Sequence, residues 1–275
     1  MSIFEGIILG IIQGLTELLP VSSSAHLVIA QSLMEGFHQP GVLFDVVLHM
    51  GTLFAVVFFF RKDIWNIAKS LIPVTWLPLS LCHDNRATTT IRRKTALLII
   101  IGTVPAVIVG FLFRHEIHSL FDSLEITAFM LLITGGMLFI SDGIKHADKG
   151  ENEMTVTDSI VIGIAQAVAL VPGISRSGST IAFGIFRKLD REAAARFSFL
   201  LSVPAICGAI VLESRYVTSV PTSDMMAYGI GFLAAAVTGF LSLKFLFFIL
   251  KKQNLKIFAY YCWFVGCTTL ILSYF

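Results

Sequence analysis

The sequence predicts an all-α, polytopic membrane protein with six transmembrane helices and two re-entrant helix–loop–helix segments, arranged as an inverted-topology repeat. Three observations support this prediction: the composition, six apolar runs, and two apolar regions interrupted by polar residues. Of 275 residues, 56% are hydrophobic and 14% are charged, against about 25% charged in soluble domains, and the mean hydropathy is +0.84. A soluble fold cannot bury that much apolar surface, so we expect membrane lipid as the solvent.

The net charge, the cysteines and the N-terminal stretch exclude other classes of protein. The formal net charge of +2 is too small to indicate nucleic-acid binding. The four cysteines form no CxxC pair, so we expect neither a disulfide framework nor a zinc site. The N-terminal stretch lacks a basic region, and Glu5, Gln13 and Glu17 interrupt its apolar run, which is not typical of a signal peptide. We therefore expect the first segment to remain in the mature protein.

Six apolar runs have the length of a membrane-spanning helix, which needs roughly 20 mostly apolar residues. The runs are Val42–Phe60, Thr95–Phe113, Ser123–Ser141, Ala194–Leu212, Met226–Leu250 and Lys256–Tyr274. Residues Ile67–Leu81 contain Pro73, Trp76 and Pro78, so we expect this segment to lie at the membrane interface rather than to cross.

Two further apolar regions are interrupted near their middle. Ile3–Met34 contains Gln13, Glu17, Pro20 and a run of serines, and Ser159–Phe186 contains the stretch 172–180. Each apolar half is too short to cross a membrane alone, so each region is predicted to enter and to return. Non-helical backbone at membrane depth must be covered by protein or line a water-filled cavity.

The distribution of lysine and arginine predicts the orientation in the membrane. The connections after the first and third spans, after the second interrupted region and between the last two spans are rich in basic residues. By contrast, the only Lys or Arg within residues 112–122 is Arg114, and the only one within residues 213–225 is Arg215. The positive-inside rule places the basic loops in the cytoplasm. The first interrupted region then enters from outside and the second from the cytoplasm, so that their tips can meet near the midplane.

The two halves of the chain resemble each other, which predicts one membrane domain, 1–275, built from repeats 1–150 and 151–275. Gly10-Ile-Ile-Gln13 recurs as Gly163-Ile-Ala-Gln166, and both are followed by a proline and serines. Phe44–Leu48 and Phe197–Leu201 match at the same spacing, as do Ala128 and Gly135 with Ala259 and Gly266. A shared apolar composition could produce such matches by coincidence. Inverted repeats place binding sites at the repeat interface, on discontinuous helices.

The first interrupted region carries an acid, a hydroxyl and an imidazole. Gln13 and Glu17 lie four residues apart and share a helix face, and a carboxylate at membrane depth costs roughly 2.5–3.5 kcal/mol. Ser22 or Ser23 suits the N-cap of the returning helix, whose N-terminus attracts phosphate. Ser23 and His26 share a face, an arrangement that activates a nucleophile. The alternative is a polar helix cap with His26 in the membrane interface.

The second interrupted region carries a guanidinium among hydroxyls. Arg176 offers a donor fork suited to phosphate oxygens, and Ser175, Ser177 and Thr180 surround it in the sequence. The alternative is an arginine that only pairs with Glu17. Together the two tips predict a site for a phosphorylated group, and the hydroxyl beside an imidazole favours phosphoryl transfer over binding alone.

Asp45 and His49 also lie within a predicted span, four residues apart on one face. A proton relay, a contact with substrate and a structural pair all remain open for these two residues.

Two long motifs resemble those of a known family. Gln-Gly-Leu-Thr-Glu-Leu-Leu-Pro-Val-Ser-Ser-Ser-Ala-His at 13–26 and Pro-Gly-Ile-Ser-Arg-Ser-Gly-Ser-Thr at 172–180 resemble the signature motifs of the bacterial undecaprenyl-pyrophosphate phosphatases of the bacitracin-resistance type. The likeness covers essentially the whole chain. It implies hydrolysis of undecaprenyl pyrophosphate to undecaprenyl phosphate and inorganic phosphate, which recycles the carrier lipid for cell-wall synthesis. It also implies a multi-pass protein of the cytoplasmic membrane, an active site open to the outer face, and a divalent cation such as Mg²⁺.

The resemblance also implies roles for individual residues. The family's catalytic positions correspond to Glu17, Ser23, His26 and Arg176, and the motif positions near the phosphates to Ser22, Ser175, Ser177 and Thr180. Gln13 stands where the family has Glu or Gln; an amide binds a cation more weakly than a carboxylate, so Gln13 is expected to contact the substrate. Glu17 is then the expected metal ligand. We expect His26, oriented by Glu17, to deprotonate Ser23, or His26 or Glu17 to activate water directly.

Two other functions share parts of this pattern. A transporter or flippase for a phosphorylated lipid or anion would also use inverted repeats and helix N-termini. Membrane acid phosphatases related to phosphatidate phosphatase carry Pro-Ser-Gly-His and a Ser-Arg that is followed later by His. Ser-Ala-His at 24–26 and Ser175-Arg176 are similar to these elements, but no histidine follows His146 here, so their nucleophile is missing. The sequence leaves a homodimer open.

Overall fold

The computed structural model describes residues 1–34, 42–71, 86–121, 123–145, 147–214 and 224–273, and these residues are mainly helical. The first half holds α1 (Ile3–Leu18), α2 (Ser23–Ser32), α3 (Val42–Phe59), α4 (Arg61–Leu71), α5 (Arg86–Leu112), α6 (Arg114–Leu120) and α7 (Leu124–Asp142). The second half holds a short 3-10 helix (Glu151–Glu153), α8 (Val156–Val168), α9 (Arg176–Phe186), α10 (Arg191–Ser214), α11 (Met225–Lys251) and α12 (Lys256–Ser273). The prediction of an all-α protein is confirmed for the described residues.

Several helices are long and apolar enough to cross a membrane. Among the described residues, α7, α11, α12 and parts of α5 and α10 meet this condition, which makes five candidate spans. The number rises to six if α3 and α4, which meet at a bend of 79°, count as one broken span. The protein is therefore a multi-pass membrane protein by the length and composition of its helices.

The first predicted span ends at a sharp bend. The apolar run stops at Phe60, and Arg61-Lys62-Asp63 begin α4 in a new direction. Phe60 stays buried in the core against Phe199 and Phe247, whereas Trp65 on α4 is exposed. Part of the predicted interfacial segment Ile67–Leu81 belongs to α4, and its residues 72–81 lie outside the described residues.

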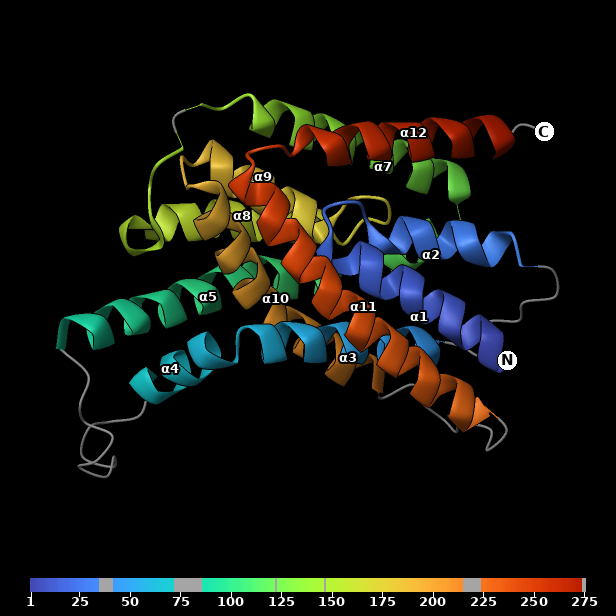
Figure 1. Ribbon diagram of the computed structural model, residues 1–275, viewed down its shortest axis with the longest axis horizontal. Helices are drawn as coiled ribbons and strands as arrows, with labels where there is room; N and C mark the ends of the chain where they lie inside the picture. Colours follow the sequence, from blue (N-terminus) through green and yellow to red (C-terminus); the bar gives the residue numbers. More distant parts are fainter. Residues whose placement is uncertain (35–41, 72–85, 122, 146, 215–223, 274–275) are drawn as a thin grey trace.

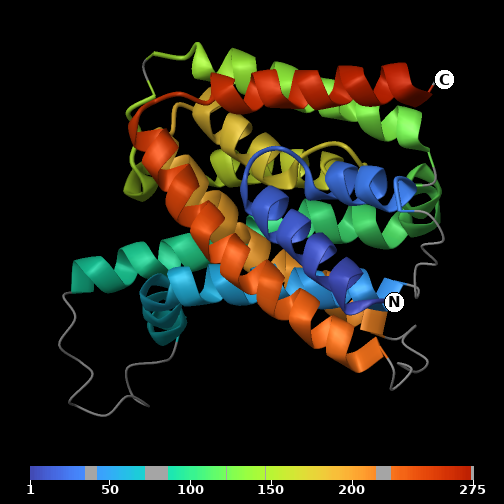
Figure 2. The same ribbon diagram turned by 45° about the vertical axis from the view of Figure 1, so that its right-hand side comes forward.

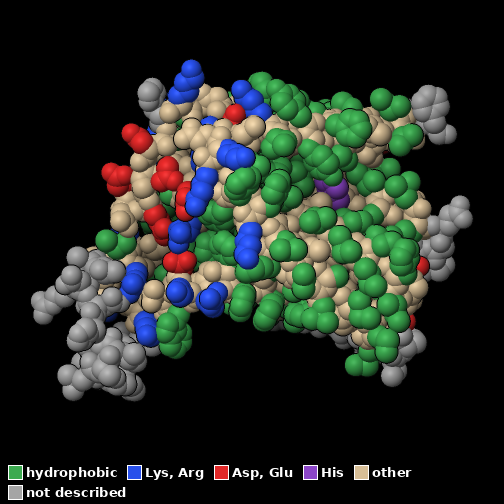
Figure 3. Space-filling view, in the orientation of Figure 1, with side chains coloured by type: hydrophobic (Ala, Val, Ile, Leu, Met, Phe, Trp, Pro, Cys, Tyr) green, Lys and Arg blue, Asp and Glu red, His purple; other side chains and the backbone are tan. Residues whose placement is uncertain are grey.

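Charged and apolar side chains occupy different parts of the surface. Most Lys, Arg, Asp and Glu side chains on the face in Figure 3 gather toward the end on the left, and hydrophobic side chains cover much of the rest. Figure 1 places α4, the start of α5 and α8 toward this charged end, and the N-terminus with α1 and α2 toward the opposite end. The two interrupted regions therefore form helical hairpins, α1–α2 and α8–α9, that extend inward from opposite ends of the molecule, as Figure 2 also shows.

Glycines allow the closest helix contacts, and they do so in matching pairs. α1 packs on α11 and α8 packs on α5. A Cβ at Gly10 would overlap the carbonyl oxygen of Gly231, and a Cβ at Gly163 would overlap that of Gly102. Small residues at membrane helix interfaces permit such backbone approach. Gly10 and Gly163, which correspond in the sequence, therefore make the same kind of contact with a glycine carbonyl of the facing helix.

The α7–α12 pair shows the same correspondence within itself. A Cβ at Gly135 would lie 3.0 Å from the carbonyl oxygen of Ala259, and a Cβ at Gly266 would lie 3.0 Å from that of Ala128. The contact is reciprocal, which is the property of two equivalent elements that pack across a two-fold axis.

Candidate active site

The tip of the first hairpin is a turn between α1 and α2. Leu19 is extended (φ −78°, ψ 149°), as expected for a residue that precedes proline, so α1 ends at Leu18. Ser22 adopts φ 68°, which is uncommon for a residue other than glycine. Its hydroxyl accepts the backbone N–H of Ala25 and caps α2, so that Ser23 becomes the first residue of the helix. Of the two predicted N-cap residues, Ser22 is the one the structure uses.

The tip of the second hairpin repeats this arrangement. Gly173 has φ +90°, and a Cβ at this position would overlap the carbonyl oxygen of Thr127, so the close approach to α7 requires glycine. The hydroxyl of Ser175 accepts the backbone N–H of Gly178 at 3.0 Å and caps α9. Arg176 is consequently the first residue of α9.

Hydrogen bonds join the two tips directly. The backbone N–H of Gly173 donates to Ser24 Oγ at 3.3 Å, and Ser177 Oγ donates to the carbonyl of Leu19 at 3.1 Å. Thr134 on α7 supports the second tip, because its hydroxyl donates to Gly173 O and accepts from the backbone N–H of Ser175, both at 3.0 Å. The predicted meeting of the two tips is therefore present in the structure.

Glu17 lies at the centre of this meeting point. Its Oε1 accepts Arg176 Nη2 at 2.6 Å, and its Oε2 accepts Ser23 Oγ at 2.5 Å and Gln13 Nε2 at 3.3 Å. The Nε2 atom of His49 lies 3.7 Å from the same Oε2. The Glu17 side chain is only 9% exposed and that of Arg176 16%. The structure thus brings together an acid, a hydroxyl and a guanidinium from both hairpins in a largely buried place.

His26 and Ser23 are not hydrogen-bonded to each other in the structure, unlike the predicted hydroxyl–imidazole pair. Its Nδ1 lies 2.7 Å from the carbonyl oxygen of Ser22, and its Nε2 lies 2.9 Å from the hydroxyl of Tyr261 on α12. The rings of His26 and Tyr261 also stack, with centroids 5.5 Å apart. A carbonyl only accepts, so Nδ1 carries the proton and Nε2 accepts from Tyr261. The bond to its own helix turns the imidazole toward α12, and Glu17 takes the place beside Ser23.

The hydroxyls predicted to bind substrate hold the two tips in shape. Ser22 and Ser175 cap their helices, and Ser177 bonds the opposite tip. Thr180 Oγ1 donates to the carbonyl of Arg176 at 2.7 Å and lies 2.5 Å from Ser198 Oγ. These four side chains therefore fix the backbone whose N–H groups, at the starts of α2 and α9, remain suited to an anion.

Two buried polar atoms of the site have no hydrogen-bond partner in the described part of the chain: Gln13 Oε1 and Arg176 Nη1. Buried polar atoms in folded proteins are nearly always satisfied. An unpaired guanidinium N–H beside two helix N-termini suits the oxygen of a phosphate group. These atoms are the observation that indicates a ligand.

No group of three or more His, Cys, Asp or Glu side chains within residues 1–34, 42–71, 86–121, 123–145, 147–214 and 224–273 could hold a metal ion. Glu17, the predicted metal ligand, already binds Arg176 and Ser23. An arginine paired with the single carboxylate favours an anion at this place over a bare cation.

Two residues of the site were not given a role by sequence reasoning. His49 was noted for its position on the first span, but its contact with Glu17 joins two helices and leaves no local pattern. Tyr261 contacts His26 from 235 residues further along the chain, and its own surroundings in the sequence are ordinary for an apolar helix. Only the folded arrangement identifies these contacts.

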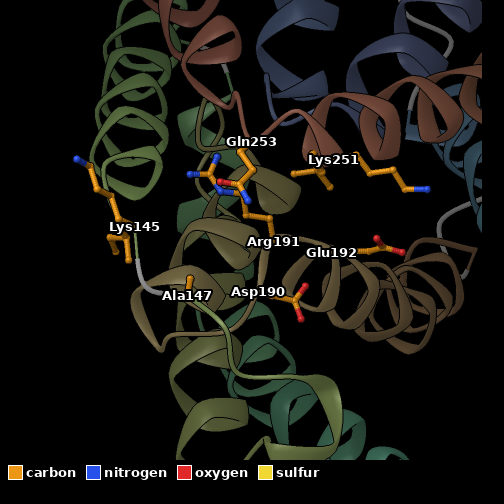
Figure 4. A pocket seen from close by; sticks show the side chains of 9 residues that line it. Lys145, Ala147, Asp190, Arg191, Glu192, Lys251 and Gln253 are labelled. Atoms are coloured by element: carbon orange, nitrogen blue, oxygen red, sulfur yellow. The ribbon is translucent and has the colours of Figure 1, made fainter.

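A cavity of about 200 Å³ lies elsewhere, at the charged end. Its walls are the segment after α7, the start of α10 and the end of α11, with Lys145, Asp190 and Lys251 among the lining residues in Figure 4. Asp190 accepts the backbone N–H of Ala193, and Arg191 is bound to Asp142. None of the predicted site residues lines this cavity, so we do not regard it as the active site.

The comparison with known proteins agrees with the two motifs. Residues 6–268 match the protein family described as bacitracin resistance protein BacA. Proteins named undecaprenyl-diphosphatase are similar to nearly the whole chain. Those of Methanobrevibacter smithii and Halothermothrix orenii are 40% identical over 267 and 275 residues, which cover 97% and 99% of this chain and 96% and 99% of the relatives. That of Chlorobaculum tepidum is 41% identical over 286 residues, 99% of this chain and 97% of the relative. The chain therefore belongs to the bacitracin resistance protein BacA family.

Proposed function

We propose that this protein hydrolyses undecaprenyl pyrophosphate to undecaprenyl phosphate and inorganic phosphate, and so recycles the carrier lipid for cell-wall synthesis. The observation that carries the proposal is the position of Glu17 between Ser23 Oγ and Arg176, with Arg176 Nη1 left unpartnered. The relatives' name, undecaprenyl-diphosphatase, indicates the same reaction.

In the proposed mechanism the diphosphate binds to Arg176 and to the N-termini of α2 and α9. Glu17 Oε2 accepts the proton of Ser23, and Ser23 Oγ attacks the terminal phosphorus. The bond from that phosphorus to the bridging oxygen breaks, and undecaprenyl phosphate leaves with the electron pair. Water then hydrolyses the phosphoserine and releases inorganic phosphate. In the variant without a covalent intermediate, Glu17 activates water directly.

His26 remains a proposed catalytic residue, with a role separate from Ser23. Its Nε2 lone pair is held by the Tyr261 hydroxyl, which water can replace. We assign to it the attacking water of the second step, because Nε2 can accept a proton there while Nδ1–H stays bonded to Ser22. Gln13, Ser22, Ser175, Ser177 and Thr180 support the bound phosphates, Gln13 through its amide and the others chiefly through the backbone they fix.

A divalent cation, proposed as Mg²⁺, would neutralise part of the diphosphate charge when bound. Glu17 is the residue expected to contact it, but a carboxylate already paired with Arg176 does not make a metal site alone. The cation is therefore proposed to arrive with the diphosphate. EDTA should then lower the rate without lowering the unfolding temperature of the substrate-free protein, and a resident structural metal would lower both.

The proposed topology has six spans and two re-entrant hairpins, in inverted repeats 1–150 and 151–275. The reciprocal glycine contacts and the entry of the hairpins from opposite ends support it. The positive-inside rule puts the charged end in the cytoplasm, so the α1–α2 hairpin faces outward from the cytoplasmic membrane. In a cysteine-free background, an impermeant thiol reagent should label Leu33→Cys from outside and Lys145→Cys only after lysis. Labelling of both from one side would contradict this topology.

The decisive experiment measures phosphate release from undecaprenyl pyrophosphate by the purified protein in detergent. We expect turnover by the wild type and its loss in Arg176→Ala, with the unfolding temperature of each protein measured as a control for folding. A transporter or flippase would release no phosphate under these conditions. A wild type without phosphatase activity would overturn the proposed function.

A further inference from the structure

The helix α4 turns away from the span that precedes it. The apolar helix α3 meets α4 at a bend of 79°. A helix at nearly a right angle to a membrane span lies along the membrane surface rather than across it. Figure 1 places α4 at the end of the molecule where Figure 3 shows most of the Lys and Arg side chains of this face. The bend therefore puts α4 at the level where hydrocarbon meets water.

One face of α4 is fixed to the rest of the protein. Asp63 Oδ2 accepts Arg196 Nη1 on α10 at 3.0 Å, and the carbonyl oxygen of Ser70 accepts Arg93 Nε on α5 at 2.6 Å. Two apolar side chains of the same face pack against the main hydrophobic core, Ile64 and Ile67. These contacts fix the rotation of α4 about its axis, and they engage Asp63, the only acidic residue of the helix.

The opposite face of α4 is basic and carries an exposed tryptophan. The side chain of Trp65 is 61% exposed, and Lys69 Nζ lies 5.0 Å from the centre of its indole ring. Arg61 and Lys62 are exposed, and Lys62 makes no ion pair within the described part of the chain. At 100° per residue these four side chains fall within an arc of about 100°. The bonds of the inner face thus direct three basic side chains and one aromatic side chain outward together.

Arg61 marks the level of the lipid headgroups. Its Nη1 donates to the carbonyl of Phe58 at 2.9 Å, and its guanidinium lies 4.9 Å from the centre of the Phe58 ring. The side chains of Phe54 and Phe58 are 56% and 48% exposed on α3, a surface that lipid chains cover in a membrane. A basic side chain that lies along such a surface keeps its charge among the headgroups. The basic face of α4 therefore continues the lipid-facing surface of α3.

We propose that the face of α4 formed by Arg61, Lys62, Trp65 and Lys69 binds anionic phospholipid headgroups of the leaflet at the charged end. Basic side chains beside a membrane attract anionic lipids, and no acidic side chain of α4 opposes them on this face. Trp65 suits the same level, because indole rings favour the membrane–water interface. This face contains none of the candidate active-site residues, so the inference does not depend on the proposed reaction.

The test uses Trp65 as the only tryptophan, in a Trp76→Phe/Trp263→Phe protein reconstituted in phosphatidylcholine vesicles. A small fraction of the lipid, either phosphatidylglycerol or phosphatidylcholine, carries bromine on its acyl chains near the headgroup, and bromine quenches tryptophan fluorescence on contact. We expect brominated phosphatidylglycerol to quench Trp65 at least about fivefold more strongly per lipid, the effect of one basic side chain at an anionic surface. Added salt should reduce this preference, because salt screens exposed charges.

Variants identify the side chains that are responsible. Replacing the three basic residues of this face should make the two brominated lipids quench Trp65 equally, in Arg61→Gln/Lys62→Gln/Lys69→Gln. The matched control removes three lysines elsewhere at the charged end and should keep the preference, in Lys145→Gln/Lys251→Gln/Lys252→Gln. The unfolding temperature of each variant in detergent checks its folding. The single change Lys62→Gln breaks no ion pair of the described chain, and it should lower the preference in part.

Three results would overturn the proposal. The first is equal quenching by the two brominated lipids in the protein that keeps all its basic residues. The second is quenching by neither lipid, which would mean that protein rather than lipid covers Trp65. The third is a preference that survives the changes on α4, or that falls as far in the matched control and therefore reflects net charge alone.

Discussion

The two hairpins share a backbone design and differ in the chemistry placed upon it. In each, a serine caps the returning helix, Ser22 for α2 and Ser175 for α9, and the next residue occupies the first helical position. That residue is Ser23 in one hairpin and Arg176 in the other. Equivalent positions thus present the proposed nucleophile from one side and the proposed anion-binding cation from the other.

The acid belongs to one hairpin only. Glu17 lies in the last turn of α1, whereas Leu170 follows α8 at the corresponding place in the second motif. The buried glutamines that precede them are retained in both, as Gln13 and Gln166, and both have unpartnered amide atoms in the described chain. The two hairpins thus share their serine caps and their buried glutamines and differ in the residues that are proposed to react.

The largest expected effect follows from removal of the Glu17 carboxylate, which only one hairpin carries. Glu17→Gln keeps the shape of the side chain but cannot accept the Ser23 proton, so kcat should fall about 10³-fold, as for the loss of a general base. Leu170→Ala at the matched position should retain most of the activity. Phosphate release per folded protein measures both. Comparable losses in the two variants would mean that Glu17 has no special role.

The N-terminal ends of the two hairpins are expected to contribute differently to the stability of the protein. Both begin with a capping box, Ser2 with Glu5 at the surface and Thr155 with Asp158 in the interior. Asp158 also binds Lys149 and Arg187 and is fully buried. Asp158→Asn should therefore cost about 2 kcal/mol, because it weakens the charge-assisted hydrogen bonds that the buried carboxylate accepts.

The matched variant at the surface is Glu5→Gln, which should cost about 0.5 kcal/mol or less. Unfolding of both variants in detergent by denaturant measures the difference. If the two changes destabilise the protein equally, Asp158 does not anchor the second hairpin more firmly than Glu5 anchors the first.

The arginine tests the second hairpin alone. Arg176→Lys retains the positive charge but loses the donor fork, so it cannot serve Glu17 and a phosphate oxygen together. We expect kcat/KM to fall about 30-fold, or about 2 kcal/mol, which is less than for Glu17→Gln. Steady-state kinetics with the lipid substrate would measure this fall in kcat/KM. A fully active lysine variant would mean that charge alone is sufficient.

The smallest expected effects concern the paired glycines. Gly10→Ala and Gly163→Ala each place a methyl group against a carbonyl oxygen of the facing helix, so each should destabilise the protein by about 1–2 kcal/mol. A Cβ at Gly208 meets nothing within 4 Å, and Gly208→Ala should leave the unfolding temperature nearly unchanged. Similar losses of stability in Gly10→Ala and Gly163→Ala would support the equivalence of the two hairpins. A loss of stability in only one of the two variants would count against it.

Sequence reasoning predicted the parts of the fold that local chemistry controls. Pro20 and Gly173 interrupt apolar runs, serines cap the helices that follow, and both tips were expected where they are found. The bend after Phe59 was not predicted, because no proline or glycine marks it and the change of direction depends on Phe60 packing into the core.

The site was only partly predictable for the same reason. Glu17 and Arg176 could be brought together from topology, since both were assigned to hairpin tips. The orientation of His26 depends on Tyr261, and the contact of His49 depends on how α3 packs beside α1; neither follows from spacing along the chain. The hydroxyls of Ser175 and Thr180 were expected to face a ligand; in the structure Ser175 caps α9, and Thr180 donates to the carbonyl of Arg176 on its own helix.

The glycine seam between α1 and α11 determines where a long lipid can lie. Gly6, Gly10 and Gly14 bring α1 so close to α11 that no methyl group fits between the two backbones. A polyisoprenoid chain is several times wider than that space, so this wall is closed to it. If the proposed headgroup binds at Glu17, its hydrocarbon chain must leave through another side of the bundle, because α1 and α11 leave no space between them.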